Sequence, residues 1–293
     1  MGCNGIDAAA PENETRLILL GTKGGPRPSL TRSNPANLII SGDGAYLIDC
    51  GYGTTRQLLA SGVQPHELDA IFITHHHSDH TLELGLLLYH AWITGLRRPI
   101  EVFGPAPLSA LIAKFFEAFW FEIASRMQDE GRSNPRELVR VHEIEAAGVV
   151  MERSHLRVTA GRVYHPPLKD AFGYRFDAPH RSIVLSGDTA LCPELIHLAK
   201  RADVLVHEVM RVESLPKLIG QQPNAVALHA HLIASHTTTE QVGLVAARSE
   251  VGTLVLNHFV PGDDPSITDE MWLSAPRKAF GEAVIAGRDL LVV

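Results

Sequence analysis

The sequence predicts an α/β fold in which two β-sheets pack face to face and helices cover their outer faces. Short apolar runs of strand length, bounded by turn residues, recur in both halves of the chain. Helical patterns fall in the connections between these runs. The 293 residues, 45% of them hydrophobic, are enough for one large domain or two small ones. We expect residues 1–14 to form a flexible tail and residues 15–293 to form a single domain.

The first half of the chain carries four predicted strands and one short helix. Gly42, Asp43 and Gly44 separate two of the strands, a combination that is typical of a hairpin. The last of these strands runs directly into a cluster of histidines. The strands are residues 15–21, 37–41, 45–49 and 68–74, the helix is residues 54–61, and a glycine-rich loop occupies residues 22–28.

A helical pattern begins at Pro105 and continues to about Arg126, and the residues from there to Gly148 are polar and mixed. We therefore expect a helical insert around residues 105–148. Its aromatic side chains favour packing between helices, although an insert that covers an active site would have the same composition. These aromatic residues are Phe115, Phe116, Phe119, Trp120 and Phe121.

The strand pattern resumes after the insert. A helix is expected to begin near Thr239, where a preceding hydroxyl can cap the first turn. The predicted strands are residues 155–164, 171–176, 182–186, 204–206 and 253–256, and the predicted helices are residues 193–200 and 239–248.

Histidine, with 16 residues, is the one residue type in excess. Such an excess suggests metal or acid–base chemistry, and scattered surface histidines are the alternative. The three cysteines are far apart, so we expect neither a disulfide framework nor a thiolate zinc site. The net charge of −7 argues against a nucleic-acid partner, because a surplus of Lys and Arg is needed to displace counterions from phosphates.

The chain contains no apolar stretch of membrane-spanning length, and its first residues do not resemble a secretory signal. We therefore expect a cytoplasmic protein with no membrane span. Cys3 follows a small residue, which leaves a trimmed lipoprotein of periplasmic origin as the alternative.

The strongest local signal is a run of metal-binding side chains directly after the strand at residues 68–74. In extended backbone, residues two apart point to the same side, so His75 and His77 can converge on one metal ion. Asp79 and His80 can then bind a second ion a few ångströms away. Imidazole and carboxylate ligands favour zinc, with manganese or iron as alternatives. A histidine-rich polar turn is the bland alternative.

Three further candidate ligands lie just beyond the ends of predicted strands: His165, Asp188 and His258. Asp188 follows Gly187, which allows close approach of the backbone to a site. Each of the three alone is equally consistent with a structural role. Together with the histidine cluster they complete a set for two ions.

Taken in order, these residues resemble the signature of the metallo-β-lactamase fold hydrolases. The resemblance runs from Leu17 to His258 and includes Asp49 after an early strand. It implies a four-layer αββα sandwich. Within the superfamily the chain most resembles the branch that holds tRNase Z and the zinc arylsulfatases, and the latter share a glycine-rich first loop like residues 21–26.

The resemblance implies two zinc ions and a set of ligands for each. Asp188 would bridge the ions, and Asp49 would orient a ligand imidazole. The family's pattern places His75, His77 and His165 on the first ion and Asp79, His80 and His258 on the second.

A proton-transfer pair is also implied. His207 and Glu208 resemble the start of the H-E-A-T segment of tRNase Z, and residues 235–238 resemble its later G-H-S-T. In that family the Glu and the late His protonate the leaving group, so these roles are implied for Glu208 and His236. The chain departs from the family after Glu208, and a structural role for this carboxylate is the alternative. His229 and His231 flank the same predicted loop and either could face substrate or lie on the surface.

The chemistry implied is hydrolysis of an ester-type bond at phosphorus, sulfur or carbon. Two divalent ions lower the pKa of a shared water and polarise the ester. Asp79 is expected to accept a proton and His236 to donate one to the departing oxygen. No nucleophilic Ser or Cys is needed, and the chain has no G-x-S-x-G motif.

Small-molecule esters, such as aryl sulfates or phosphodiesters, are the substrates that we expect. Long-arm tRNase Z enzymes carry a tRNA-binding arm between the lone His and the Gly-Asp motif, and only 22 residues separate His165 from Asp188 here. The aromatic helix, if it lies beside the metals, would favour an apolar substrate.

Several alternatives stay open. They are a tRNase Z-like endonuclease that processes tRNA 3′ ends, a β-lactam or lactone hydrolase, and a non-catalytic binding module. For lactones, Tyr164 and Tyr174 are candidate helpers. A homodimer is expected because relatives of this type are commonly dimers.

Overall fold

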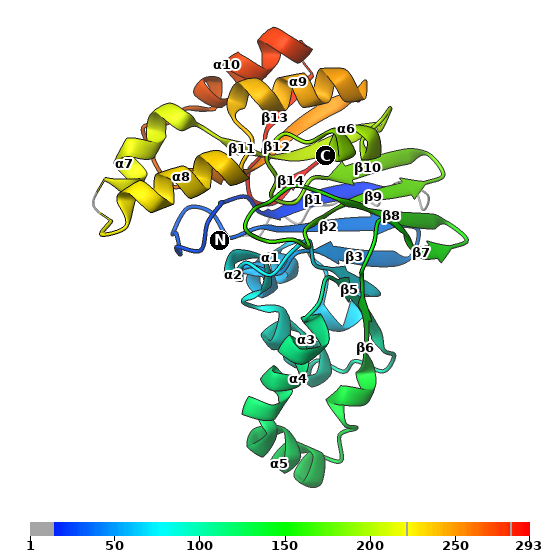
Figure 1. The fold of residues 1–293 in the computed structure, drawn as a ribbon. Helices are drawn as coiled ribbons and strands as arrows, with labels where there is room; N and C mark the ends of the chain where they lie inside the picture. Colours follow the sequence, from blue (N-terminus) through cyan, green and yellow to red (C-terminus); the bar gives the residue numbers. More distant parts are fainter. Residues whose placement is uncertain (1–14, 221, 282) are drawn as a thin grey trace, which may run out of the picture.

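The computed structural model describes residues 15–220, 222–281 and 283–293. Two mixed sheets pack face to face, and helices cover both outer faces, as Figure 1 shows. The expected αββα sandwich is therefore confirmed. The homodimer, the cytoplasmic compartment and the single domain stay predictions. The expected tail at residues 1–14, with Cys3, lies outside the described residues.

The first sheet has an antiparallel half and a parallel half. A hairpin joins β2 and β3 through Gly42 and Asp43, and the strands beyond β3 are parallel to one another. In spatial order the strands are β14 (Leu291–Val292), β1 (Arg16–Gly21), β2 (Ala36–Ser41), β3 (Gly44–Ile48), β4 (Ala70–Phe72), β5 (Ile100–Gly104) and β6 (Val139–Glu143).

The second sheet repeats this division. Four strands from β7 to β10 are antiparallel neighbours, and β10, β11, β12 and β13 are parallel. In spatial order the strands are β13 (Val284–Ala286), β12 (Thr253–Val260), β11 (Val204–Met210), β10 (Arg181–Leu185), β9 (Phe172–Ala178), β8 (Leu156–Arg162) and β7 (Gly148–Arg153).

Three apolar layers hold the four structural layers together. In β1, Leu17 and Leu19 face the second sheet, whereas Ile18 and Leu20 face the helices. A strand that is buried on both faces reads as a continuous apolar run, which is why the sequence pattern identified it. The helices on the first sheet are α1 (Thr54–Ala60), α2 (Ser78–Thr81), α3 (Leu84–Ile93), α4 (Leu108–Ala118) and α5 (Trp120–Glu130). Those on the second sheet are α6 (Pro193–Leu198), α9 (Thr239–Ser249) and α10 (Asp269–Phe280).

The predicted insert is present and contains more than helices. After α4 and α5 comes a 3₁₀ turn, η2 (Pro135–Leu138), and then the edge strand β6. The polar side chains of β6 concealed it from the sequence pattern, because an edge strand is only partly buried. Two other 3₁₀ turns lie at η1 (Pro65–Glu67) and η3 (Val212–Ser214).

The segment between β11 and α9 was expected to be a loop and is a pair of helices. These are α7 (Leu215–Ile219) and α8 (Ala225–Ser235), which extend to the left in Figure 1. They enclose a small apolar cluster of their own with Met210 and Val260. The apolar residues of α8 surround the helix rather than marking one face, so no periodic signal announced it.

Aromatic packing between the sheets yields a stability prediction. Phe72 of β4 is fully buried, with ring centroids 5.0 Å from Phe103 and 5.2 Å from Phe176. We expect Phe72→Ala to lower the free energy of unfolding by about 3–5 kcal/mol, because it leaves a cavity between the sheets. Phe121→Ala, at a side chain that is 91% exposed, should change it by less than about 0.5 kcal/mol. Urea unfolding measures both, and equal losses would contradict the assigned core.

Candidate metal centre and active site

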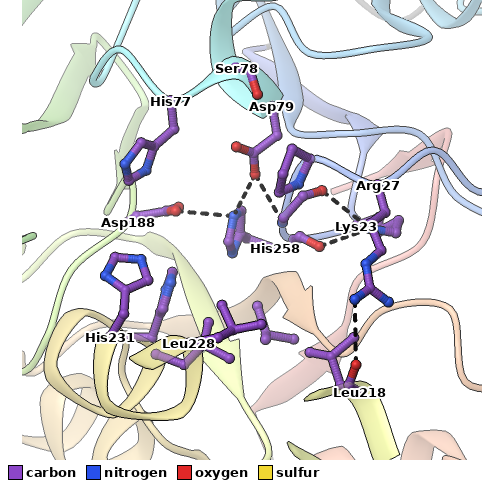
Figure 2. Close-up of a pocket in the computed structure, with 16 residues that line it drawn as sticks. Lys23, Arg27, His77, Ser78, Asp79, Asp188, Leu218, Leu228, His231 and His258 are labelled. Atoms are coloured by element: carbon purple, nitrogen blue, oxygen red, sulfur yellow. Dashed lines mark hydrogen bonds and ion pairs between the residues drawn. The ribbon is translucent and has the colours of Figure 1, made fainter. Parts of the chain in front are cut away.

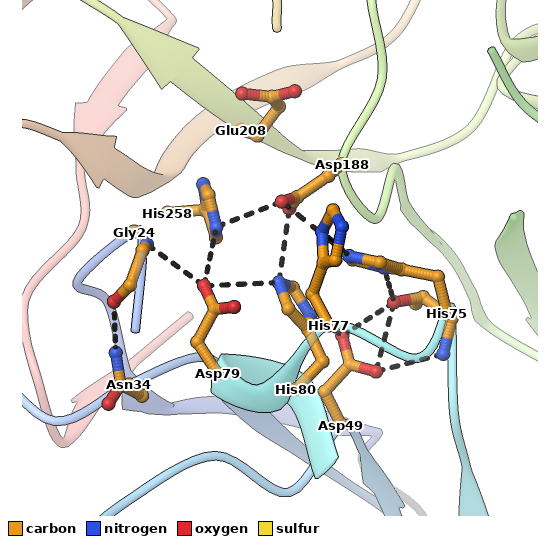
Figure 3. Close-up of polar contacts among 12 residues, drawn as sticks. Gly24, Asn34, Asp49, His75, His77, Asp79, His80, Asp188, Glu208 and His258 are labelled. Atoms are coloured by element: carbon orange, nitrogen blue, oxygen red, sulfur yellow. Dashed lines mark hydrogen bonds and ion pairs between the residues drawn. The ribbon is translucent and has the colours of Figure 1, made fainter. Parts of the chain in front are cut away.

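The site lies where parallel strands of both sheets end. The chain segments after β3, β4 and β10 and the last residues of β12 meet at one edge of the sandwich. A pocket opens at this edge (Figure 2). Figure 3 shows the polar contacts among the converging side chains. Carboxyl ends of parallel strands are the usual place for sites in α/β folds. All seven predicted ligands come together here.

His75, His77 and His165 form the first group, together with Asp188. The Nδ1 atom of His77 lies 3.1 Å from Nε2 of His75 and 3.0 Å from Nε2 of His165. Asp188 Oδ2 lies 3.8 Å from Nε2 of His75 and 3.9 Å from Nε2 of His165. Burial lowers the pKa of His75 and of His77, and it lowers the pKa of His165 to about 4. The three imidazoles are therefore neutral near pH 7, as metal ligands must be.

Asp79, His80 and His258 form the second group, again with Asp188. His258 Nε2 lies 3.1 Å from Oδ2 of Asp188 and 3.4 Å from Oδ2 of Asp79. His80 Nε2 lies 3.3 Å from Oδ1 of Asp188. Burial alone would raise the pKa of Asp79, but the imidazoles of His80 and His258 outweigh it and lower this pKa to about 2. Burial likewise opposes the effect of Asp188 on His258, whose pKa rises to about 10. The carboxylates of Asp79 and Asp188 therefore favour a positive charge between the side chains of this second group.

The residues fit a divalent metal ion. Among the described residues, His80 Nε2, His258 Nε2 and Asp188 Oδ1 are buried and make no contact with the geometry of a hydrogen bond. Buried polar atoms without such a partner are rare, and these three lie within one group of converging ligand atoms. Imidazole nitrogen and carboxylate oxygen are the donors that zinc prefers, and iron or manganese accepts them as well.

Partners behind the two groups fix the imidazoles. Asp49 Oδ2 lies 2.8 Å from Nδ1 of His80, so the expected contact with a candidate ligand is present. Asp49 also accepts hydrogen bonds from the backbone N–H and the hydroxyl of Thr74. Nδ1 of His165 lies 2.9 Å from the carbonyl oxygen of Ser235. In both histidines these contacts leave Nε2 directed at the centre.

The glycine-rich first loop presses against the second group. A Cβ on Gly24 would lie 2.7 Å from the ring of His258, so only glycine fits there. The N–H of Gly25 donates to Asp79 Oδ2 at 2.9 Å. The buried ammonium of Lys23 donates to the carbonyls of Gly24 and Gly25, and burial lowers its pKa. Sequence reasoning missed Lys23, although a lysine inside a glycine-rich loop at a strand end was the available signal.

The predicted proton-transfer pair is in contact. Nδ1 of His236 lies 2.9 Å from Oε2 and 3.1 Å from Oε1 of Glu208, and the N–H of Thr189 donates to Oε1 at 2.7 Å. Burial alone would lower the pKa of His236, but the Glu208 carboxylate outweighs it and raises this pKa. His236 also lines the pocket, whereas Glu208 lies behind it. The pair can therefore present a proton to a bound molecule.

The pocket has a volume of about 300 Å³ and two unlike sides. Lys23 and Arg27 lie on the right in Figure 2, and His231 and Leu228 of α8 lie on the lower left. Leu218, Leu232 and Val260 add apolar surface.

The aromatic helix of the insert does not border this pocket, contrary to our expectation. The ring of Phe115 packs over Gly85 of α3, so α4 and α5 lie on the outer face of the first sheet, at the bottom of Figure 1. The apolar wall comes instead from α7 and α8. The argument from the aromatic helix for an aryl substrate is therefore wrong.

Four other candidate substrate-binding residues differ in whether they reach the pocket. His231 lines the pocket, and burial lowers its pKa. His229, two residues earlier on the same helix, is exposed. Tyr174 is buried and donates its hydroxyl to the carbonyl of Ile73, so it is committed to the core. Tyr164 is 60% exposed and does not line the pocket.

The model of the β-lactamase superfamily domain matches residues 45–259, which include all seven candidate ligands. The chain belongs to this superfamily. It is a metal-dependent hydrolase that resembles tRNase Z.

Its relatives include ribonuclease Z from several mycobacteria. The chain is 31% identical over 277 residues to ribonuclease Z of Mycobacterium bovis (strain BCG / Pasteur 1173P2), a match that covers 94% of the chain and 96% of the relative. It is 32% identical over 277 residues to ribonuclease Z of Mycobacterium marinum (strain ATCC BAA-535 / M), with the same coverage.

Solved structures share the superfamily's fold. The metallo-β-lactamase fold protein YhfI of Bacillus subtilis matches with a TM-score of 0.70 at 18% identity. The match covers 96% of this chain and 100% of the YhfI chain. The short form of human tRNase Z has a TM-score of 0.68 at 21% identity, covering 95% of this chain and 98% of its own. None of the helices in the described part of this hydrolase has the length and hydrophobicity needed to cross a bilayer.

Metal content tests the two ligand groups. We expect the purified hydrolase, expressed with zinc, to carry about two ions per chain by elemental mass spectrometry. Asp188→Ala should carry well under one, because both groups lose the carboxylate that they share. His76→Ala is the matched control, since His76 belongs to the same run but points its Nε2 at the carbonyl of Pro105, 2.7 Å away. Full zinc in a folded Asp188→Ala protein would contradict the assignment.

Proposed function

We propose that this hydrolase is a dinuclear zinc phosphodiesterase that cleaves RNA, as a tRNA 3′-processing endonuclease of ribonuclease Z type. The main support is its identity of more than 30% to ribonuclease Z over 94% of the chain. The contact between Glu208 and His236 supports it further. The sequence favours small aryl esters and argues against a nucleic-acid partner, and these relatives reverse that preference.

The seven ligand candidates would hold the ions in two overlapping sets. Asp188, which contacts both groups, would serve both ions. Ions held there would lower the pKa of a coordinated water and neutralise charge on the phosphate. His75, His77 and His165 would bind one ion, and Asp79, His80 and His258 would bind the other.

Asp79 would orient and deprotonate the attacking water. Its Oδ2 is engaged by the N–H of Gly25 and lies near His258. Its other oxygen has no hydrogen bond to any described residue, so it can accept a proton in the pocket. Because one oxygen of the Asp79 carboxylate is held by a hydrogen bond, the other oxygen keeps a fixed orientation for proton transfer.

Glu208 and His236 would complete the reaction. Water attacks phosphorus, the bond from phosphorus to the departing ribose oxygen breaks, and the proton on His236 passes to that oxygen. The Glu208 carboxylate stabilises the protonated imidazole before transfer and holds its ring toward the pocket. Such a general acid matters most when the departing group is a poorly stabilised alkoxide.

The cations beside the site favour an anionic substrate. Lys23 and Arg27 both line the pocket, and Arg27 is exposed. A neutral lactone or acetate ester would gain little from these two charges. A phosphodiester could interact with both.

Hydrolysis of small phosphodiesters is the second candidate. Strands β9 and β10 and short connections fill the chain between His165 and Asp188, so this segment holds no tRNA-binding arm. The net charge of −7 also weakens the general attraction for RNA. Both observations favour a substrate small enough to be held by the pocket alone.

A direct comparison separates the two candidates. We expect the zinc-loaded enzyme to remove the 3′ trailer from a precursor tRNA with a kcat/KM well above that for bis-p-nitrophenyl phosphate. Asp79→Ala should lower both activities by at least about 100-fold. Turnover of the small diester with an intact precursor tRNA at physiological salt would favour the second candidate.

The dependence on leaving group tests the general acid. Glu208→Gln should lower kcat on precursor tRNA by about 100-fold, because His236 then loses the carboxylate that keeps it protonated. The same variant should lose less than about fivefold on bis-p-nitrophenyl phosphate, since nitrophenolate departs without a proton. Equal losses on both substrates, with zinc content unchanged, would assign Glu208 to a structural role.

A further inference from the structure

His231 presents a hydrogen-bond acceptor to the pocket. Its Nδ1 lies 3.2 Å from the hydroxyl oxygen of Ser235, and that hydroxyl donates its hydrogen to the carbonyl of Pro166 at 2.6 Å. A serine hydroxyl has one hydrogen, so Nδ1 of His231 must be the donor in the first contact. In the neutral ring the other nitrogen, Nε2, is then an acceptor.

The Nε2 atom is free to act on a bound molecule. His231 lines the pocket, and its Nε2 makes no hydrogen bond to any described residue. The residue belongs to neither candidate ligand group. Its ring centroid lies 6.3 Å from the rings of His77 and His236, so it borders the metal centre without contacting it.

On its own helix His231 has apolar neighbours, and it lies away from the cations. Leu228 and Leu232 of the same helix line the pocket beside it, whereas Lys23 and Arg27 lie on the other side in Figure 2. A donor group of a substrate that entered this apolar side would lose water and need an acceptor. The imidazole of His231 supplies one.

RNA carries a donor at the required place. Every ribose has a 2′-hydroxyl on the carbon next to O3′, the oxygen that joins it to the following phosphate, and DNA lacks this hydroxyl. Two imidazoles whose centroids are 6.3 Å apart can reach two oxygens on adjacent carbons, each at an ordinary hydrogen-bond distance. If His236 protonates O3′, His231 is placed to bind the 2′-hydroxyl.

We propose that His231 Nε2 accepts a hydrogen bond from the 2′-hydroxyl of the ribose on the 5′ side of the cleaved bond, and so selects RNA over DNA, a role that rests on the proposed function. His231 is thus a specificity residue: it binds the hydroxyl beside the departing oxygen, and His236 transfers the proton. Lys23 and Arg27 bind the phosphate from the opposite side.

A single-atom change in the substrate tests this role. Precursor tRNA with ribose or 2′-deoxyribose at the one nucleotide 5′ to the cleavage site is compared on wild type, His231→Phe and His231→Gln. Wild type should prefer ribose by about tenfold in kcat/KM, the value of one hydrogen bond. His231→Phe should lower this ratio to about one by losing activity on ribose alone. His231→Gln, which keeps an acceptor oxygen, should retain part of the preference.

Matched controls exclude a general defect. His229→Phe makes the same change on an exposed face of the same helix and should keep the full preference. Bis-p-nitrophenyl phosphate, which has no hydroxyl, measures any general loss in His231→Phe, and the loss on the ribose precursor should exceed that loss by about tenfold. As a readout without turnover, fluorescence anisotropy measures binding of the mature RNA 3′ end, and His231→Phe should bind the ribose and deoxyribose ends equally well.

The outcomes are distinct. A ribose preference that persists unchanged in His231→Phe, or that is absent from wild type, overturns the role of His231 and leaves RNA cleavage intact. Failure of the wild-type enzyme to cleave either precursor overturns the proposed function and the role of His231 together.

Discussion

The buried carboxylate of Asp188 is the constraint on which the rest of the site depends. Its oxygens lie 3.8 Å from Nε2 of His75 in the first group and 3.1 Å from Nε2 of His258 in the second. A buried charge is tolerated only when it is paired, so the segments that carry these imidazoles must meet around it. Gly187 makes this approach possible, because a Cβ there would lie 3.0 Å from the side chain of Thr74. The turn before Asp188 thereby joins the second sheet to the end of β4.

The sandwich holds this arrangement against backbone strain. Asp49 and His258 both adopt positive φ angles, 63° and 43°, which are uncommon for residues with a side chain. Hydrogen bonds from Thr74 fix the carboxylate of Asp49, and the glycine-rich loop packs against His258. The aromatic layer around Phe72 keeps the two sheets in register behind them. The site can be strained locally because the surrounding core is firmly packed.

The pocket has two sides with different chemistry, and each comes from a different part of the chain. The first loop contributes cations and the backbone N–H that holds Asp79. The helices between β11 and α9 contribute an apolar wall and His231. The RNA substrate proposed above fits both sides, because it offers a phosphate to the cations and a ribose hydroxyl to His231.

The sequence by itself indicated nine of the fourteen strands in the described residues and the candidate ligands, and its family resemblance implied the pair of Glu208 and His236. The ligands could be found because they follow strand ends, whose local geometry depends only on neighbouring residues. Only the tertiary structure decided which helices cover the site. The aromatic insert packs behind the first sheet and α8 brings His231 to the pocket, because both placements depend on contacts between segments far apart in the chain. A local pattern carries no record of such contacts, so the sequence offered His229 and His231 equally, and only the structure placed His231 in the pocket.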